Sequence, residues 1–335
     1  MYQDKTYEWQ PNFPKTNAWN AIMSGINLSD LSYVAYQVTA LDLMARFLVD
    51  FGITEANRTD ASLYMRGQGS RPFIHMSVQG DENLFLGGAF QVESKADLEK
   101  AANIPGSSDI VEVDRPGGGL EVTLTTPNGH SLWLTCGSEN TPQTDRKQAG
   151  RMNFADYVNR VDKPVRLASG MAPILRLGHF VVRVQDEAAE TAWFTEHFNL
   201  IPSDYLGAPG GPSDEVIGTF LRFDRGADPV EHHCLLINKS EGAPCHHSSF
   251  QLLDLDAVMM GHDHLLGSGW NLDSGVGRHL LGRLIYDYWL DPFGNRVEHY
   301  TDMDMLTENH EPVMFSGTAD ETTQWGKPVP PSFFD

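Results

Sequence analysis

Three residues in the C-terminal half of the chain have side chains that could hold one metal ion: His179, His247 and Glu298. Each lies in a short stretch whose alternating polar and apolar residues predict a β-strand. Two neutral imidazoles and one carboxylate on one face of an iron(II) ion leave three coordination positions open. A molecule that chelates through two oxygens would fill two of them and dioxygen the third. The first hypothesis is therefore a metal centre that uses oxygen.

The neighbours of these three residues support a site inside a curved sheet. On each predicted strand the candidate ligand lies on one face, and apolar residues lie on the other, because successive side chains of a strand alternate. The apolar residues of the opposite faces are Phe180, Val182, Val184, Phe250 and Val297. We expect helices or a core to pack against that second side.

The elements that must position the site belong to an internal repeat. Residues 30–137 resemble residues 176–302 in the order and spacing of their predicted elements. Two helical stretches and two Pro- and Gly-containing turns recur at matching places, namely residues 41–51 and 186–198, and residues 126–129 and 291–294. Such self-similarity indicates copies of one supersecondary unit. Each half is predicted to hold two βαβββ units, which makes four in all.

The first half of the repeat offers an internal control for the metal site. In the alignment of the halves, Tyr33 takes the place of His179, Gly87 that of His247, and Trp133 that of Glu298. None of the three first-half residues is a plausible iron ligand. A purely structural demand of the unit would not need His, His and Glu in one copy alone. We therefore predict a metal in the second half only.

Composition bounds the possible partners and compartment. The chain has 335 residues and a formal net charge of −21, which argues against nucleic acid or an anionic membrane as a partner. Its three cysteines form no Cys-x-x-Cys pair, so reduced thiols are expected rather than a disulfide framework. The sequence starts without the pattern of a secretory signal and contains no apolar run near the ~20 residues of a membrane span. These features predict a cytoplasmic protein.

The repeat also divides the chain into regions. We predict an N-terminal domain without a metal site over residues 1–137 and a catalytic metal-binding domain over residues 176–305. A polar, proline-containing linker over residues 138–175 joins them. The Pro-, Thr- and Asp-rich residues 306–335 are expected to form an extended tail that packs over a domain surface.

One longer motif resembles a known family. Residues 277–298 are similar to the signature of type I extradiol ring-cleavage dioxygenases, which belong to the vicinal oxygen chelate superfamily. The motif runs Gly-x-His from Gly277, then Tyr-x-x-Asp-Pro-x-Gly from Tyr288, and ends at Glu298. The resemblance covers nearly the whole chain. It implies an α+β fold of two tandem domains, each of two βαβββ modules that form a curved incomplete barrel.

The resemblance also implies the ligand set. His179, His247 and Glu298 match the family's iron ligands, and His247 is the matching member of the pair His246-His247. By strand alternation His246 should then face the opposite side and serve in packing or at the surface. One residue departs from the pattern: Asp287 stands where the family usually has an aliphatic residue, which we expect to alter the packing behind Tyr288.

Three further residues match catalytic positions of the family. His233, rather than its neighbour His232, corresponds to the acid–base histidine. His279 lies 19 residues before Glu298 and Tyr288 lies ten before it, as in the family. The resemblance implies that His233 moves a proton, since an imidazole suits proton transfer near neutral pH. His279 and Tyr288 would hydrogen-bond the oxygens of the substrate and of the oxygen-derived species.

The activity implied by the resemblance is extradiol (meta) cleavage of a substituted catechol by O2 at a non-haem Fe(II) site. The product would be of the muconic semialdehyde type. Mn(II) accepts the same ligands, no organic cofactor is implied, and a homo-oligomer is expected. Other functions stay open: a dioxygenase acting on a hydroquinone or other non-catechol ring, a glyoxalase-like isomerase, or a non-catalytic ligand-sequestering protein of the same fold.

Overall fold

The computed structural model describes residues 25–143, 152–167, 169–212, 215–242, 244–327, 329–330 and 333. The start of the predicted N-terminal domain, the middle of the predicted linker and most of the last five residues of the tail lie outside these ranges. Within the part of the chain that is described, no helix combines the length and the apolar character needed to cross a membrane.

The described chain contains the four predicted βαβββ units in succession. The first comprises β1 (Leu28–Val38), α1 (Leu41–Asp50), β2 (Thr54–Arg58), β3 (Ser62–Arg66) and β4 (His75–Gln79). The second comprises β5 (Leu84–Val92), α2 (Lys95–Ala101), β6 (Val111–Glu112), β7 (Leu120–Thr125) and β8 (Ser131–Cys136). The third comprises β9 (Arg176–Val184), α3 (Glu187–His197), β10 (Leu200–Gly207), β11 (Val216–Phe223) and β13 (Leu235–Lys239), with the short β12 (Val230–Glu231) between the last two. The fourth comprises β14 (Cys245–Gln251), α4 (Leu255–Gly267), β15 (Asn271–His279), β16 (Ile285–Leu290) and β17 (Arg296–Thr301).

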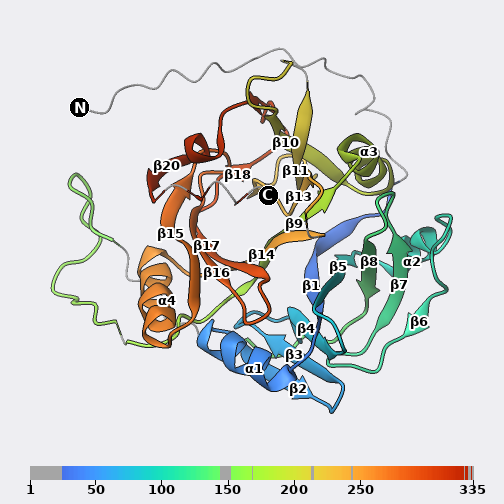
Figure 1. Ribbon diagram of the computed structural model, residues 1–335, viewed down its shortest axis with the longest axis horizontal. Coiled ribbons are helices and arrows are strands. Elements are labelled where there is room, and N and C mark those ends of the chain that lie inside the picture. Colours follow the sequence, from blue (N-terminus) through green and yellow to red (C-terminus); the bar gives the residue numbers. More distant parts are fainter. Residues whose placement is uncertain are drawn as a thin grey trace.

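Each pair of units forms one curved sheet, and the two sheets share one topology. The first runs β2-β3-β4-β1-β5-β8-β7-β6. The second runs β10-β11-β13-β9-β14-β17-β16-β15 and is extended by one further strand at each edge. Figure 1 shows the first sheet curling at the lower right and the second at the upper left. The predicted fold of two curved, incompletely closed barrels is confirmed.

The strand register confirms the alignment of the two halves. Tyr33 and Trp133 pair with the same residue of β5. His179 and Glu298 likewise pair with one residue of β14. These two pairs of residues therefore occupy equivalent positions in the two sheets, although only the pair in the second sheet consists of candidate metal ligands.

Local sequence explains where the elements begin and end. Asp186 caps α3 by accepting a hydrogen bond from the backbone N–H of Ala189, and Ser94 caps α2 in the same way. Gly52 follows α1 with a φ of 106°, a conformation that glycine adopts without steric penalty. The two predicted tight turns close hairpins, since the N–H of Gly129 and that of Gly294 each bond the carbonyl three residues earlier.

The two halves share one hydrophobic core. The ring of Phe180 on β9 lies against the backbone of Gly88 on β5, where a Cβ atom would approach it to 2.4 Å. Phe250 on β14 meets Phe51 edge to face at 5.7 Å between ring centroids. Tyr36 on β1 donates a hydrogen bond to the hydroxyl of Ser248 at 3.1 Å. These contacts fix the site-bearing strands β9 and β14 against the first sheet.

The tail extends the second sheet. β19 (Met314–Phe315) pairs with β10, and β20 (Thr323–Gly326) pairs with β15, so the tail adds a strand to both edges. A short β18 (Met305–Leu306) pairs with β12, and a 3-10 turn (Ala319–Thr322) precedes β20. Edge strands of a sheet present unpaired backbone groups, and these additions cover them.

Candidate metal centre

Three neighbouring strands bring the predicted ligands together. His179 lies on β9, His247 on β14 and Glu298 on β17, and these strands are adjacent in the second sheet. Their side chains reach the same interior face, where a group of ligand atoms lies within 4.8 Å of one another. The three residues are only 1%, 6% and 0% exposed.

The distances between the ligand atoms fit a shared ion. The Nε2 atoms of His179 and His247 are 3.3 Å apart. Glu298 Oε2 lies 3.0 Å from His179 Nε2 and 3.5 Å from His247 Nε2. Metal bonds to imidazole and carboxylate are about 2.0–2.2 Å long, so two ligands at right angles lie about 3 Å apart. The three atoms thus have the spacing of one face of a coordination sphere.

The environment of the Glu298 carboxylate favours a bound cation. Neither of its oxygens accepts a hydrogen bond of acceptable geometry from the described residues, although both are buried. Burial alone would raise the pKa of this carboxyl, but the imidazoles of His179 and His247 hold the pKa well below its usual range. A buried, charged carboxylate is strongly destabilising unless its charge is balanced, and neutral imidazoles do not balance it. A divalent ion between the three ligands would remove that cost.

The donor set also restricts the kind of ion. Two imidazoles and one carboxylate on one face, with other positions open, is the arrangement of non-haem iron(II) oxygenases. Burial lowers the pKa of His247 to about 4, so its imidazole is neutral near pH 7 and can donate a lone pair to a metal. The residues present therefore fit a divalent transition metal.

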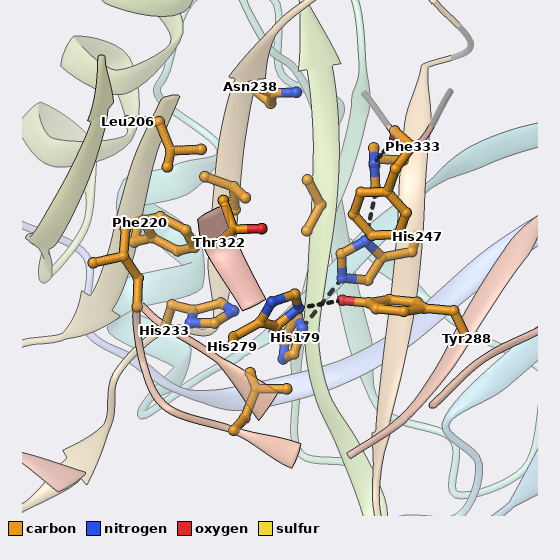
Figure 2. Close-up of a pocket in the computed structure, with 15 residues that line it drawn as sticks. His179, Leu206, Phe220, His233, Asn238, His247, His279, Tyr288, Thr322 and Phe333 are labelled. Carbon is orange, nitrogen blue, oxygen red and sulfur yellow. Dashed lines mark hydrogen bonds between the residues drawn. The ribbon is translucent and has the colours of Figure 1, made fainter. Parts of the chain in front are cut away.

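The three residues predicted to act on the substrate lie around the same cavity (Figure 2). The ring of His233 is 4.3 Å from the ring of His179. His279 at the end of β15 lies 2.8 Å, through its Nε2, from the hydroxyl of Tyr288 on β16. His233, His279 and Tyr288 all line the cavity beside His179 and His247.

Burial keeps these groups uncharged near neutral pH. It lowers the pKa of His233 well below its ordinary value, and it lowers the pKa of His279 to about 4. Burial and the nearby carboxylate of Glu298 raise the pKa of Tyr288. A neutral His233 can accept a proton, and a neutral Tyr288 can donate a hydrogen bond.

The neighbouring histidine of each His-His pair has a different environment. His232 turns away from the cavity, and its Nε2 lies 2.8 Å from a carboxylate oxygen of Asp204. His246, in contrast, lines the cavity, and its Nδ1 is 2.6 Å from the Nδ1 of His247. The expectation that His246 faces the opposite side is wrong. A β-bulge between Cys245 and His247 places an extra residue in β14 and turns both imidazoles to one side.

Asp287 also lies away from the cavity. Its side chain is fully buried and accepts hydrogen bonds from His262 of α4, at 2.9 Å, and from the indole of Trp289, at 2.7 Å. The unusual residue before Tyr288 therefore joins β16 to α4 behind the sheet.

Sequence reasoning missed most of the cavity wall. The lining beyond the metal face is mainly apolar and comprises Val181, Leu206, Phe220, Leu236, Asn238, Leu281, Leu284, Thr322 and Phe333. Phe333 comes from the tail and lies edge to face against Tyr288 at 4.9 Å. Strand alternation could have placed Leu236 and Asn238 on one face, but no pattern in the tail indicates the position of Phe333.

The equivalent place in the first half is filled with side chains. The hydroxyl of Tyr33 donates a hydrogen bond to Glu121 at 2.9 Å, and Arg115 forms an ion pair with the same carboxylate. The ring of Trp133 lies over Gly87, where a Cβ atom would be only 2.8 Å from it. The carboxylate there already has a cationic partner in Arg115, so it does not need a metal ion.

Comparisons with known proteins agree with this architecture. Residues 176–299 match the family model described as Glyoxalase/Bleomycin resistance protein/Dioxygenase superfamily. Over 305 residues the chain is 26% identical to Metapyrocatechase 2 from Cupriavidus necator, covering 90% of each protein. It is also 26% identical over 197 residues to Metapyrocatechase from Pseudomonas sp. (strain CF600), covering 59% of this chain and 58% of that protein.

Solved structures share the fold at lower identity. The Mn(II)-bound glyoxalase from Novosphingobium aromaticivorans superposes with a TM-score of 0.76 at 19% identity, covering 92% of this chain and 94% of that one. The homoprotocatechuate 2,3-dioxygenase from Arthrobacter globiformis gives a TM-score of 0.75 at 18% identity, covering 92% and 91%. The vicinal oxygen chelate fold and the similarity to extradiol dioxygenases that the motifs predict are confirmed.

Proposed function

We propose that this chain, a member of the Glyoxalase/Bleomycin resistance protein/Dioxygenase superfamily through residues 176–299, is an extradiol dioxygenase that opens the ring of a substituted catechol with O2. The observation that carries the proposal is the buried face of His179, His247 and Glu298 with neutral proton-handling groups beside it. An isomerase or a sequestering protein would not need this combination.

We assign the metal to His179, His247 and Glu298, with Fe(II) as the natural ion and Mn(II) as one that the same ligands accept. When bound, the metal supplies open positions for two substrate oxygens and for O2, and it brings the reactants together. The remaining chemistry belongs to the side chains around the cavity.

Each of the other residues has a role that its environment supports. His233 is neutral and accepts a proton from a hydroxyl of the catechol, then returns it later in the reaction. Tyr288 and His279, already joined by a hydrogen bond of 2.8 Å, orient the substrate oxygens. The apolar wall packs against the ring and excludes water, which strengthens the polar contacts.

The natural substrate and partners follow from the same proposal. The protein acts on a small catechol and O2, and its net charge of −21 disfavours nucleic acid and anionic membranes. We place it in the cytoplasm as a homo-oligomer.

Oxygen uptake after anaerobic loading with Fe(II) tests the function. The loaded protein should consume O2 on a panel of catechols and release a yellow semialdehyde product. The variant His247→Ala should lose this activity. Tyr33→Phe, at the position of the first half that is equivalent to His179, is the matched control and should keep the activity.

Each alternative gives a different result. Uptake on hydroquinones alone would identify a dioxygenase for a non-catechol ring. Turnover of a glyoxalase substrate without O2 would identify an isomerase. One bound iron per chain with no turnover on any of these would contradict an enzymatic role.

A further inference from the structure

The cavity has a polar side chain that the proposed reaction does not use. Asn238 on β13 lines the cavity and is 5% exposed. None of the described residues forms a hydrogen bond with its side-chain amide. Its neighbour on the same strand face is Leu236, so an apolar residue would be expected here. An amide that faces the cavity without a partner among the described residues is free to hydrogen-bond a ligand, which points to a role in binding.

Asn238 lies at the end of the cavity remote from the metal face. It pairs across the sheet with Arg183, which is four residues beyond His179 on β9. At about 3.3 Å per residue, this places Asn238 about 13 Å along the strands from the level of His179. Figure 2 shows Asn238 at the opposite end of the cavity from His179 and His233.

The surroundings of Asn238 leave room for its amide. Gly218 on β11 is its other partner in the sheet. A Cβ atom at Gly218 would lie 3.4 Å from the Oδ1 of Asn238 and 3.1 Å from Leu206. Any larger residue would crowd the side chain, so the glycine keeps the space between Asn238 and Leu206 open.

The same end of the cavity does not suit a charged ligand. Among the described residues that line the cavity there is no lysine or arginine. Arg183, the partner of Asn238 on β9, does not line it and donates a hydrogen bond to the carbonyl of Phe333 at 3.4 Å. Lys239, the next residue of β13, does not line it either, and its Nζ lies 3.6 Å from a carboxylate oxygen of Glu215. A carboxylate buried here would lose its water without an ionic partner.

Building on the proposed catechol cleavage, we propose that Asn238 determines substrate specificity by binding an uncharged, hydrogen-bonding group on the ring side chain of the catechol. An amide both donates and accepts hydrogen bonds, so a hydroxyl or carbonyl suits it. The apolar residues between the two ends hold the ring and the carbon atoms of the side chain, while the two ring hydroxyls lie at the metal face.

Two probes of equal size isolate the contribution of Asn238. The Fe(II)-loaded protein is titrated anaerobically with 4-(2-hydroxyethyl)catechol and with 4-propylcatechol, and each Kd is measured by calorimetry. Asn238→Leu should weaken binding of the hydroxyl probe by about tenfold, the value of one hydrogen bond, and leave the propyl probe unaffected or tighter. Leu236→Met, on the same strand face, is the matched control and should change both probes alike.

The outcomes separate this inference from the proposed function. An equal change for both probes in folded Asn238→Leu would overturn the role of Asn238. If that variant does not fold, Asn238→Ser replaces it and should also weaken the hydroxyl probe selectively. Tighter binding of 3,4-dihydroxyphenylacetate than of the hydroxyl probe would overturn the exclusion of charge. A wild-type protein that binds no catechol would overturn the proposed function itself, whereas equal binding of both probes would overturn only the subsite.

Discussion

At the scale of single residues, the environment of Glu298 favours a bound cation. It is fully buried and charged near neutral pH, and its Oε2 lies within 3.5 Å of the imidazoles of His179 and His247. The nature and position of the three candidate ligands could be predicted because each lies in a strand-like stretch and the first half lacks them. The part played by His246 could not, because a one-residue bulge reverses the alternation on which the prediction depends.

Replacing Glu298 should separate metal binding from stability. Glu298→Gln keeps the shape of the side chain but removes the charge, and we expect it to bind less than a tenth of the iron of the wild type. Because it also relieves the buried charge, the metal-free variant should be at least as stable as the metal-free wild type. Metal analysis after gel filtration and thermal unfolding of the apo proteins measure both quantities. Full iron content in the variant would show that the ligands lie elsewhere.

His246 should act as a positioning residue for His247. A metal bound at the Nε2 of His247 requires the tautomer of His247 that carries its proton on Nδ1. The Nδ1–H of His247 then donates to the Nδ1 of His246, and the Nε2–H of His246 donates to the carbonyl of Phe333. Loss of such a partner typically costs 10- to 100-fold in metal affinity. We expect His246→Leu to lower Fe(II) affinity by about that factor and His246→Gln, which retains an acceptor, to lower it less. Competition with a chelator measures the affinity, and an unchanged value in His246→Leu would exclude the role.

At the scale of elements, the strands with clear alternation and the capped helices were predictable, while the edges of the second sheet were not. Asp186 and Ser94 cap the expected helices because their side chains replace missing backbone partners. β19 and β20 are two and four residues long, too short to show a period of two. Their pairing depends on which edges of the folded sheet remain open, so the sequence did not predict these short strands within the tail.

The contact between α4 and β16 predicts a pH-dependent stability. The hydrogen bond to Asp287 raises the pKa of His262 above its ordinary value. A group with a raised folded-state pKa adds stability that is fully present below its unfolded pKa of about 6.5 and is lost as the pH rises through the folded pKa. The Tm difference between the wild type and His262→Gln should therefore be largest near pH 6 and shrink towards alkaline pH. Met259→Gln, at an exposed position of the same helix, is the control and should show no such trend; a difference that grows with pH would contradict the assignment.

At the scale of the whole molecule, the first half lacks a metal site but forms much of the support for the second. Phe180 and Phe250 pack against the first half, and the Nε2 of His299 lies 2.7 Å from the carbonyl oxygen of Phe51. The repeat predicted two halves of one plan, yet it could not predict that they share a core, because the same apolar strand faces could each have been covered by helices alone.

A fragment of residues 169–335 should therefore fail to fold independently. Without the first half, the apolar faces of β9 and β14 would be exposed to water, and an exposed patch of this kind favours aggregation or a loosely packed state. We expect the fragment to bind a hydrophobic dye, to lack cooperative unfolding and to hold Fe(II) weakly. The intact chain should unfold in one transition. A cooperatively folded fragment that binds one iron would show that the two halves are independent.

The most direct test of the central claim is the fate of oxygen in a single turnover. The Fe(II)-loaded protein is mixed with one equivalent of a catechol under ¹⁸O2, and the product is analysed by mass spectrometry and visible absorbance. The account predicts a yellow semialdehyde whose mass is that of the catechol plus one O2, with ¹⁸O in the newly formed carboxylate. A product of unchanged mass, or a colourless dicarboxylic acid, would contradict extradiol cleavage at the face of His179, His247 and Glu298.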